Sequence, residues 1–252
     1  MSAQKIAALV TGASAGLGAE FCRQLADRCE VIIAVARRGD RLRQLRAELA
    51  SSAEVHVIEA DLTRVEGVAR TMEALRQLGP VDYLVNNAGF GTYGAFADQS
   101  IDSQRDMVSL HIDATITLCR AAIPFMRERG GGHIINVSSA GAFLPGKGLA
   151  VYGATKAFLN HFSMALQAEV AGTGIEVQAL CPGYTHTEFH RGLEREGISK
   201  DMVPAGMWMN ADAVVSVSLA ALGSGRVLVV PGEQNLALAR VGYQRQLDTL
   251  QH

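Results

Sequence analysis

The chain alternates short apolar runs with longer amphipathic segments. Several apolar runs are continuous, which is typical of strands buried on both faces. The expected strands are Ile6–Val10, Val31–Ala36, Val55–Glu59, Tyr83–Val85, His133–Val137, Ile175–Leu180 and Arg226–Val230. The expected helices are Gly16–Arg28, Arg41–Ser51, Arg64–Leu78, Ile101–Arg129, Ala150–Ala171 and Ala211–Leu222. This alternation predicts an α/β fold, a Rossmann-type doubly wound parallel sheet of about seven strands with helices on both faces.

The chain length fits one large domain, since a domain typically holds about 100–200 residues. We find no repeat, no low-complexity segment and no Pro/Gly/Ser-rich linker, so residues 1–252 are predicted to form a single domain. The stretch Glu188–Met209 fits the alternation poorly and holds Gly197, Pro204, Gly206 and Trp208. We interpret it as an insertion over the site that acts as a substrate loop.

Composition narrows the class of protein. The formal net charge is -2, which favours neither nucleic acid nor an anionic membrane as a partner. No apolar run approaches the roughly 20 residues that span a bilayer, and no secretory signal precedes the first expected strand. Cys22, Cys29, Cys119 and Cys181 are scattered and have no metal-binding spacing, so we expect buried, reduced thiols. Together these features predict a cytoplasmic protein.

The first strand runs into a glycine-rich turn. Gly12, Gly16 and Gly18 would let the backbone approach a pyrophosphate, and the helix beyond offers free N–H groups and a positive dipole end. The spacing G-x-x-x-G-x-G is a variant of the usual G-x-G-x-x-G fingerprint. The candidate phosphate-binding residues are Gly12, Ser14, Gly16, Leu17 and Gly18.

The same turn also matches the G-x-S-x-G elbow of serine hydrolases, with Ser14 as the nucleophile and His186 or His190 further along the chain. Gly18 has no role in such an elbow, and here the turn follows the first strand of the chain. A serine hydrolase is therefore a remote alternative, as is a glycine turn that binds nothing.

The end of the second strand bears on the choice of dinucleotide. An NAD site places a carboxylate about 20 residues after the glycines to bind the ribose 2′-hydroxyl. This chain has Ala36 and then Arg37 there. A guanidinium can bind a 2′-phosphate with two hydrogen bonds, so we predict NADP(H) with Arg37 as its ligand. Arg41 and Arg46 are better explained as a solvated helix face.

Tyr152 and Lys156 lie four residues apart on one face of an expected helix. A nearby ammonium can stabilise a phenolate and lower its pKa, which makes a proton donor and acceptor suited to alcohol–carbonyl chemistry. The preceding strand ends at Ser138 and Ser139, at the sheet edge where ligands bind. A hydroxyl there can hold a carbonyl oxygen, although a strand-end cap is the more common role of such a serine.

These motifs together resemble the short-chain dehydrogenase/reductase family over nearly the whole chain. The matching pieces are Thr11-Gly12-(x)3-Gly16-x-Gly18, Asp61-Leu62, Asn86-Asn87-Ala88-Gly89, Ser139, Tyr152-(x)3-Lys156 and Pro182-Gly183-(x)3-Thr187. The resemblance implies an NADP(H)-dependent oxidoreductase that interconverts a ketone or aldehyde and an alcohol. It also implies a homodimer or homotetramer.

The resemblance assigns roles to individual residues. Tyr152 would be the catalytic acid and base, Ser139 would orient the carbonyl, and Lys156 would bind the nicotinamide ribose and lower the tyrosine pKa. Asp61 would contact the adenine, Asn87 would support the sheet, and Thr187 would touch the nicotinamide carboxamide. The further cofactor-binding positions that it implies are Leu62, Ala88, Gly89, Pro182 and Gly183.

One position departs from the family pattern. Many members have a catalytic asparagine thirteen residues before a proline in the long central helix, and Pro124 places His111 there. We predict that His111 takes the proton-relay place, with an ordinary packed histidine as the equal alternative. The departure leaves open an NADPH-binding regulatory protein with little catalysis. His186 and His190 have a zinc-compatible spacing but no third ligand in the sequence, so we expect no metal.

Overall fold

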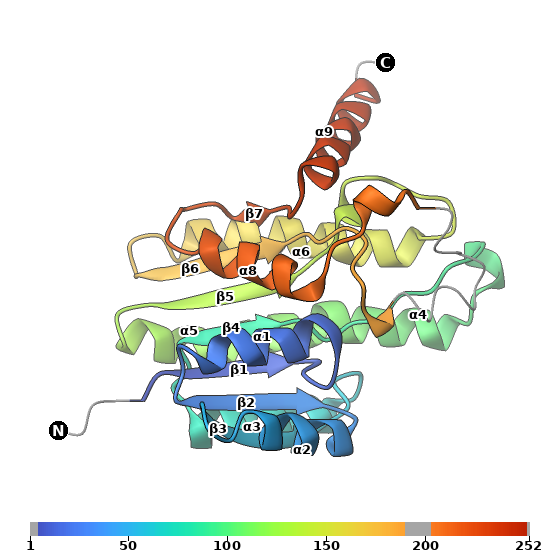
Figure 1. Cartoon of the computed structure of the whole chain (residues 1–252). Coiled ribbons are helices and arrows are strands. Elements are labelled where there is room, and N and C mark those ends of the chain that lie inside the picture. The colour runs from blue at the N-terminus through green and yellow to red at the C-terminus, as the bar shows by residue number, and fades with distance from the viewer. Residues whose placement is uncertain (1–4, 190–202, 251–252) are drawn as a thin grey trace.

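A computed structural model describes residues 5–189 and 203–250 (Figure 1). Its strands form one sheet in the order β3-β2-β1-β4-β5-β6-β7, and every neighbouring pair is parallel. They are β1 (Ala7–Thr11), β2 (Val31–Ala36), β3 (Glu54–Glu59), β4 (Tyr83–Asn86), β5 (Gly132–Val137), β6 (Ile175–Leu180) and β7 (Leu228–Val229). The predicted Rossmann-type α/β fold is confirmed.

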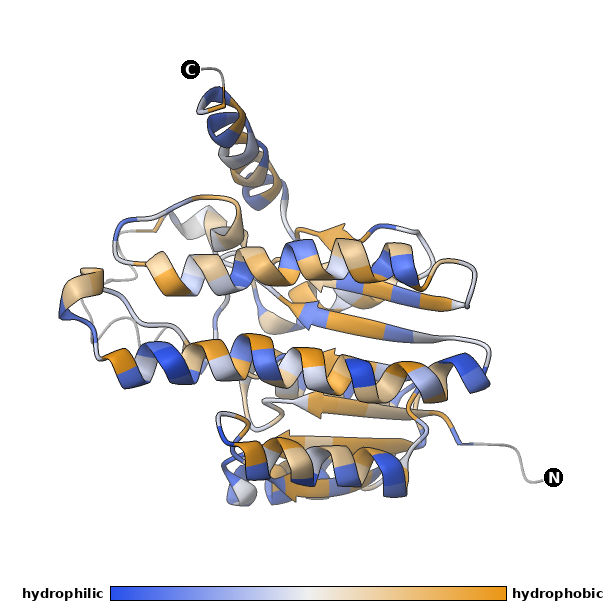
Figure 2. Ribbon diagram, turned by 180° about the vertical axis from the view of Figure 1, so that it is seen from behind, coloured by the Kyte–Doolittle hydropathy of each residue, from blue (hydrophilic) through white to orange (hydrophobic). Residues whose placement is uncertain are grey.

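Helices cover both faces of the sheet. One face packs against α1 (Gly16–Ala26), α2 (Gly39–Glu48) and α8 (Ala211–Ala221), with Phe21 and Leu42 fully buried there. The other packs against α3 (Val65–Leu78), α5 (Ala114–Glu128) and α6 (Ala150–Glu169), seen in front of the sheet in Figure 2. Strand residues alternate between the two cores: Ala8 and Val10 of β1 join the first, and Ala7 and Leu9 the second. Burial on both faces explains why the strands are continuous apolar runs.

The expected elements are present within a few residues of their predicted ends. The predicted helix Ile101–Arg129 is a continuous run of α4 (Ile101–Val108), a π-helical turn η2 (Ser109–Asp113) and α5. The helix α9 (Glu233–Asp248), which projects from the body in Figure 1, was not among the expected elements. It is a mixed-polarity segment that follows a turn at Gly232, where φ is +85°.

Part of the predicted insertion Glu188–Met209 lies outside the described residues, as does His190. Its described end forms a 3-10 turn η5 (Ala205–Met207) and a parallel bridge between Met209 and Thr185. The segment is therefore tied back to the chain just after β6.

The structure also bears on the cysteines, on membrane-spanning helices and on metal ligands. The four cysteines are buried and free of disulfides. Within residues 5–189 and 203–250, no helix has the length and apolarity to cross a bilayer. Over the same residues, no three His, Cys, Asp or Glu side chains gather as metal ligands would.

Candidate active site

The strand order reverses between β1 and β4, and the candidate residues lie at the carboxyl ends of the strands around this point. Open α/β sheets bind ligands at such switch points. Three loops meet here: the glycine turn after β1, the Asn86–Gly89 segment at the end of β4, and the turn after β5 that carries Ser139.

The glycine turn is held by β4. The side-chain nitrogen Nδ2 of Asn87 donates to the carbonyl oxygen of Thr11 at 2.8 Å. The Thr11 hydroxyl accepts from the backbone N–H groups of Asn87 and Ala88. A Cβ on Gly18 would collide with the Gly12 carbonyl and the Asn87 side chain. Asn87 thus supports the turn, in line with the support role that the family resemblance implies for it.

The first turn of α1 is suited to bind an anion. Gly12 and Gly16 have φ of +68° and +55°, which favour glycine, and α1 has neither a side-chain cap nor an acidic residue in its first turn. Thr187 faces this turn: a Cβ on Gly16 would lie 3.2 Å from the Thr187 side chain. A space that glycine keeps open, between free N–H groups and a hydroxyl residue, fits a dinucleotide pyrophosphate.

Basic side chains lie beside this turn. Arg38 donates through Nε and Nη2 to the hydroxyl oxygen of Ser14, at 3.2 and 3.1 Å, and through Nη1 to Oε2 of Glu188 at 2.8 Å. Arg37 is exposed, and its charge helps to lower the pKa of Asp61. Sequence reasoning chose Arg37 and missed Arg38 and Glu188, because adjacent arginines look alike in sequence and Glu188 is 150 residues away from Arg38.

The predicted adenine ligand, Asp61, follows β3. Its Oδ1 accepts from the backbone N–H and the hydroxyl of Thr63, at 3.0 and 2.8 Å. Burial acts to raise its pKa, but these hydrogen bonds and the charges of Arg37 and Arg64 outweigh it, so the pKa falls below its usual value. Asp61 is therefore a carboxylate at neutral pH, and its neighbour Leu62 is buried.

Tyr152 stands at the centre of the site. The Ser139 side chain lies beside it: a Cβ on Gly141 would be 3.3 Å from the Ser139 hydroxyl and 3.6 Å from the Tyr152 ring. The Ser139 hydroxyl accepts from the N–H of Gly141 at 3.0 Å. The Phe189 ring lies 6.0 Å from the Tyr152 ring, and the backbone at Gly91 approaches it from another side. Burial raises the Tyr152 pKa to about 12, and the Ser139 hydrogen bond opposes this rise only in part.

This pKa shift runs opposite to the sequence expectation, in which Lys156 lowers the tyrosine pKa. The first cause is the burial of Tyr152 itself, which disfavours the phenolate. Lys156 is also buried, and its own pKa falls to about 7 because burial disfavours its charge. Its Nζ donates to the carbonyl oxygen of Val137 at 2.8 Å and lies 5.8 Å from the centre of the Tyr152 ring. A lysine that is only partly charged does little to stabilise a phenolate.

His111 is buried within the π-helical turn and contacts two other elements. Its Nδ1 lies 2.9 Å from the Thr155 hydroxyl, which itself donates to the carbonyl oxygen of Tyr152 at 2.8 Å. Its Nε2 accepts from the backbone N–H of Phe90 at 3.3 Å. Nδ1 therefore carries the proton. Burial, and then the charge of Lys156, hold the His111 pKa well below its usual value, so the ring is neutral.

The segment after β6 forms another wall. The Pro182 carbonyl accepts from the N–H of Ala140, and the side chain of Asn235 packs against the backbone of Gly183. The Trp208 ring stacks on His186 with 5.0 Å between ring centres and lies 5.4 Å from Tyr184. These aromatic rings are held in place by the bridge between Thr185 and Met209.

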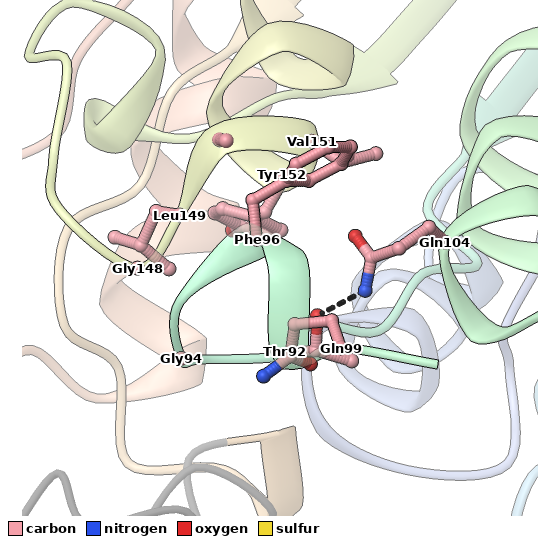
Figure 3. Close-up of a pocket in the computed structure, with 10 residues that line it drawn as sticks. Thr92, Gly94, Phe96, Gln99, Gln104, Gly148, Leu149, Val151 and Tyr152 are labelled. Carbon is pink, nitrogen blue, oxygen red and sulfur yellow. Dashed lines mark hydrogen bonds between the residues drawn. The ribbon is translucent and has the colours of Figure 1, made fainter. Parts of the chain in front are cut away.

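A pocket opens beside Tyr152, between the segment after β4 and the turn that leads into α6 (Figure 3). Its wall includes Phe96, Leu149 and Val151, and Gln104 donates to the Thr92 hydroxyl at 3.0 Å across one side. Sequence reasoning did not identify this wall, because these residues come from two segments more than 40 positions apart.

Comparison with known proteins now assigns the family. A family model described as short chain dehydrogenase matches residues 6–197. The chain therefore belongs to the short-chain dehydrogenase family and is an oxidoreductase.

Three similar proteins illustrate the relationship. An uncharacterized oxidoreductase of Staphylococcus epidermidis is 32% identical over 188 residues, 74% of this chain and 81% of the relative. Carbonyl reductase family member 4 of Xenopus tropicalis is 32% identical over 237 residues, 91% of this chain and 98% of the relative. A solved short-chain dehydrogenase from Sphingobium yanoikuyae in complex with NADPH is 32% identical, with a TM-score of 0.84, covering 97% of this chain and 95% of that one. These likenesses support a nicotinamide cofactor and a small-molecule substrate.

Proposed function

We propose that the protein is an NADP(H)-dependent oxidoreductase that interconverts a ketone or aldehyde and an alcohol, with Tyr152 as acid and base. The observation that carries the proposal is that the Tyr152 ring and the Ser139 hydroxyl lie on either side of Gly141, at the same sheet edge as the glycine turn. The similarity to a carbonyl reductase of Xenopus tropicalis supports the substrate class.

The residues fit the cofactor. The N-terminal turn of α1, bounded by Gly16 and Thr187, would hold the pyrophosphate, and Asp61 would face the adenine. Arg37, together with Arg38, would bind the 2′-phosphate, since each guanidinium can donate two hydrogen bonds to it. When bound, the reduced nicotinamide supplies a hydride to the carbonyl carbon.

The protein's own residues handle the carbonyl oxygen and the proton. The hydroxyl groups of Ser139 and Tyr152 would both donate to this oxygen, which polarises the carbonyl and aligns it. With a pKa of about 12, the phenol of Tyr152 is protonated at neutral pH and transfers its proton as negative charge develops on the oxygen.

Lys156 would return the proton to Tyr152. Its pKa of about 7 lets its ammonium both give and regain a proton near neutral pH. We propose the relay role for His111 as well, because it lies in the π-helical turn beside Lys156. Both of its ring nitrogens are engaged with Thr155 and Phe90, so a relay through the ring requires one of these contacts to open.

A nucleotide-binding regulator with little catalysis is the second candidate, and the engaged His111 ring favours it. The hydrolase alternative has no such support, because the Ser14 hydroxyl accepts hydrogen bonds from Arg38, and a guanidinium cannot act as a base. The homodimer or homotetramer, the cytoplasmic location and the single-domain organisation stay predictions.

The test is to incubate the protein with NADPH and a panel of ketones and aldehydes. Turnover is measured as the loss of absorbance at the band of the reduced nicotinamide. We expect turnover of at least one ketone or aldehyde of the panel. Tight NADPH binding with no turnover across the panel would favour the regulator, and no nucleotide binding would contradict both.

A further inference from the structure

The ion pair between Arg38 and Glu188 joins two parts of the site that are far apart in sequence. Arg38 follows β2 and precedes α2, whereas Glu188 follows Thr187 in the segment after β6. The Nη1–Oε2 distance is 2.8 Å, and the second carboxylate oxygen lies 3.9 Å from Nη2 of Arg41. The Glu188 carboxylate therefore faces two of the guanidinium groups beside the glycine turn.

The Arg38 guanidinium is shared between two kinds of partner. Nε and Nη2 point to Ser14 in the glycine turn, and Nη1 points to Glu188. One edge of the Arg38 guanidinium contacts the glycine turn and the other contacts a carboxylate. This position is suited to bind an anionic group of a dinucleotide. A carboxylate already takes one of its donors.

We propose that Glu188 competes with the 2′-phosphate of NADP(H) for the guanidinium of Arg38 and thereby sets how strongly the protein discriminates between NADPH and NADH. The inference rests on the proposed function, which puts the 2′-phosphate at Arg37 and Arg38. A phosphate monoester carries close to two negative charges at neutral pH, so it gains from Arg38 and is repelled by Glu188. The 2′-hydroxyl of NADH has no charge to repel.

The size of the effect follows from exposure. The side chains of Arg38 and Glu188 are 47% and 36% exposed, so solvent screens the pair. Exposed ion pairs stabilise weakly, and removing the competing charge should tighten NADPH binding about two- to fivefold. Because the interaction is screened by salt, the gain should shrink between low and high ionic strength.

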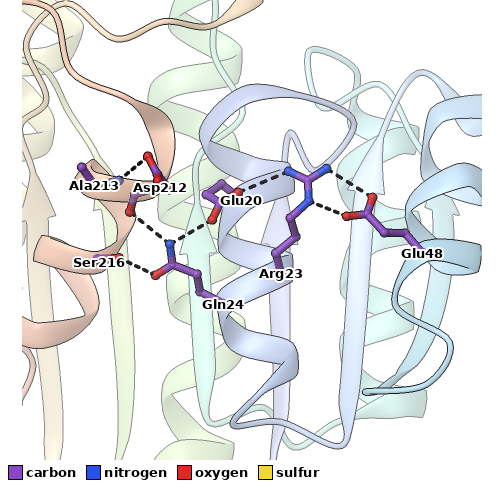
Figure 4. Close-up of polar contacts among 7 residues, drawn as sticks. All are labelled: Glu20, Arg23, Gln24, Glu48, Asp212, Ala213 and Ser216. Carbon is purple, nitrogen blue, oxygen red and sulfur yellow. Dashed lines mark hydrogen bonds and ion pairs between the residues drawn. The ribbon is translucent and has the colours of Figure 1, made fainter.

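The direct variant is Glu188→Gln, which keeps the shape of the side chain and removes its charge. The structure offers a matched control in the pair between Arg23 and Glu48, with 2.7 Å between nitrogen and oxygen and 43% and 49% exposure (Figure 4). It joins the last turn of α1 to the end of α2, away from the glycine turn. Glu48→Gln should leave the binding of both nucleotides unchanged.

The experiment measures the dissociation constants of NADPH and NADH by titration calorimetry for wild type, Glu188→Gln, Arg38→Gln and the double variant. We expect Glu188→Gln to bind NADPH about two- to fivefold tighter with NADH unchanged, and we expect this gain to be smaller in the Arg38→Gln background, where only the direct repulsion by Glu188 is removed. An unchanged NADPH-to-NADH ratio, or weaker NADPH binding in Glu188→Gln, would overturn the inference alone. A wild-type protein that binds neither nucleotide would overturn the proposed function as well.

Discussion

Nδ1 of His111 lies 2.9 Å from the hydroxyl oxygen of Thr155. Since the Thr155 hydroxyl donates to the Tyr152 carbonyl, His111 must donate from Nδ1 and accept from Phe90 at Nε2. The ring therefore connects the central helix to the helix of Tyr152 and Lys156 and to the loop after β4. This contact holds the position of the catalytic helix, whatever part the ring plays in proton transfer.

Replacing His111 by Asn should lower kcat about tenfold and stability by about 1–2 kcal/mol, because the shorter amide cannot keep both hydrogen bonds. The pH dependence has a definite sign. The folded pKa lies below the usual value of 6.5, so the unfolded state binds the proton first and wild-type stability falls as pH drops below about 6.5.

His111→Asn should lose less stability than the wild type as pH falls, which thermal melts between pH 5 and 8 would measure. Burial also lowers the pKa of His133, whose contribution to the acid loss is the same in both proteins. His161→Asn, an exposed position on α6, serves as the control. An unchanged rate and pH–rate profile in His111→Asn would remove any special role for the ring.

Replacing Tyr152 by Phe should lower kcat by about two to four orders of magnitude, the usual contribution of general acid catalysis. NADPH affinity should stay within about threefold, because the variant loses only a hydroxyl group. Steady-state kinetics and nucleotide titration check this. The control is Tyr243→Phe, on α9, where the ring meets the Phe143 ring edge to face outside the site. Substantial turnover in Tyr152→Phe would exclude Tyr152 as the acid.

Burying Lys156 costs stability at neutral pH. Its folded pKa of about 7 lies below the usual 10.5. Between pH 10.5 and 7 the unfolded state therefore binds a proton at Lys156 that the folded state does not, and the free energy of unfolding decreases as pH falls. Lys156→Met should therefore be inactive but more stable than wild type at pH 7 by about 2–3 kcal/mol, after the lost hydrogen bond to Val137 is allowed for.

The gain should shrink steadily towards pH 10, as measured by urea denaturation at several pH values. Lys147→Met, at an exposed position, serves as the control for replacing a lysine by methionine. A pH-independent difference for Lys156→Met would mean that Lys156 keeps its charge in the folded protein.

The cofactor preference should depend on the arginines that follow β2. Arg37→Gln or Arg38→Gln should lower kcat/KM with NADPH about 10- to 100-fold, the usual worth of charge-assisted hydrogen bonds, and change kcat/KM with NADH little. Arg46→Gln, on the exposed face of α2, should change neither value. Equal use of NADH and NADPH by the wild type would refute the preference.

Much of this molecule can be predicted from sequence because its signals are local. A strand buried on both faces must be apolar throughout, so Val31–Ala36 and Ile175–Leu180 were predicted with their exact ends. The glycine turn is equally local, since only glycine accepts φ of +68° and +55° at positions 12 and 16 without strain. The spacing of Tyr152 and Lys156 put both on one helical face.

Other features depend on groups that only folding brings together. The sequence placed Tyr152 and Lys156 as neighbours but gave the wrong direction for the tyrosine pKa, because burial raises the pKa of the phenol and lowers that of the lysine. Arg38 contacts Glu188, which is 150 positions further along the chain. Sequence spacing alone does not predict such a contact.

The amino-acid sequence alone thus determined the elements, their order and the types of group available for chemistry, because periodicity and backbone freedom are properties of neighbouring residues. The tertiary structure decided the protonation of those groups and their partners, including the tautomer of His111 and the pairing of Arg38. Both depend on solvent exclusion and on distances between segments, which exist only once the sheet and its helices have packed.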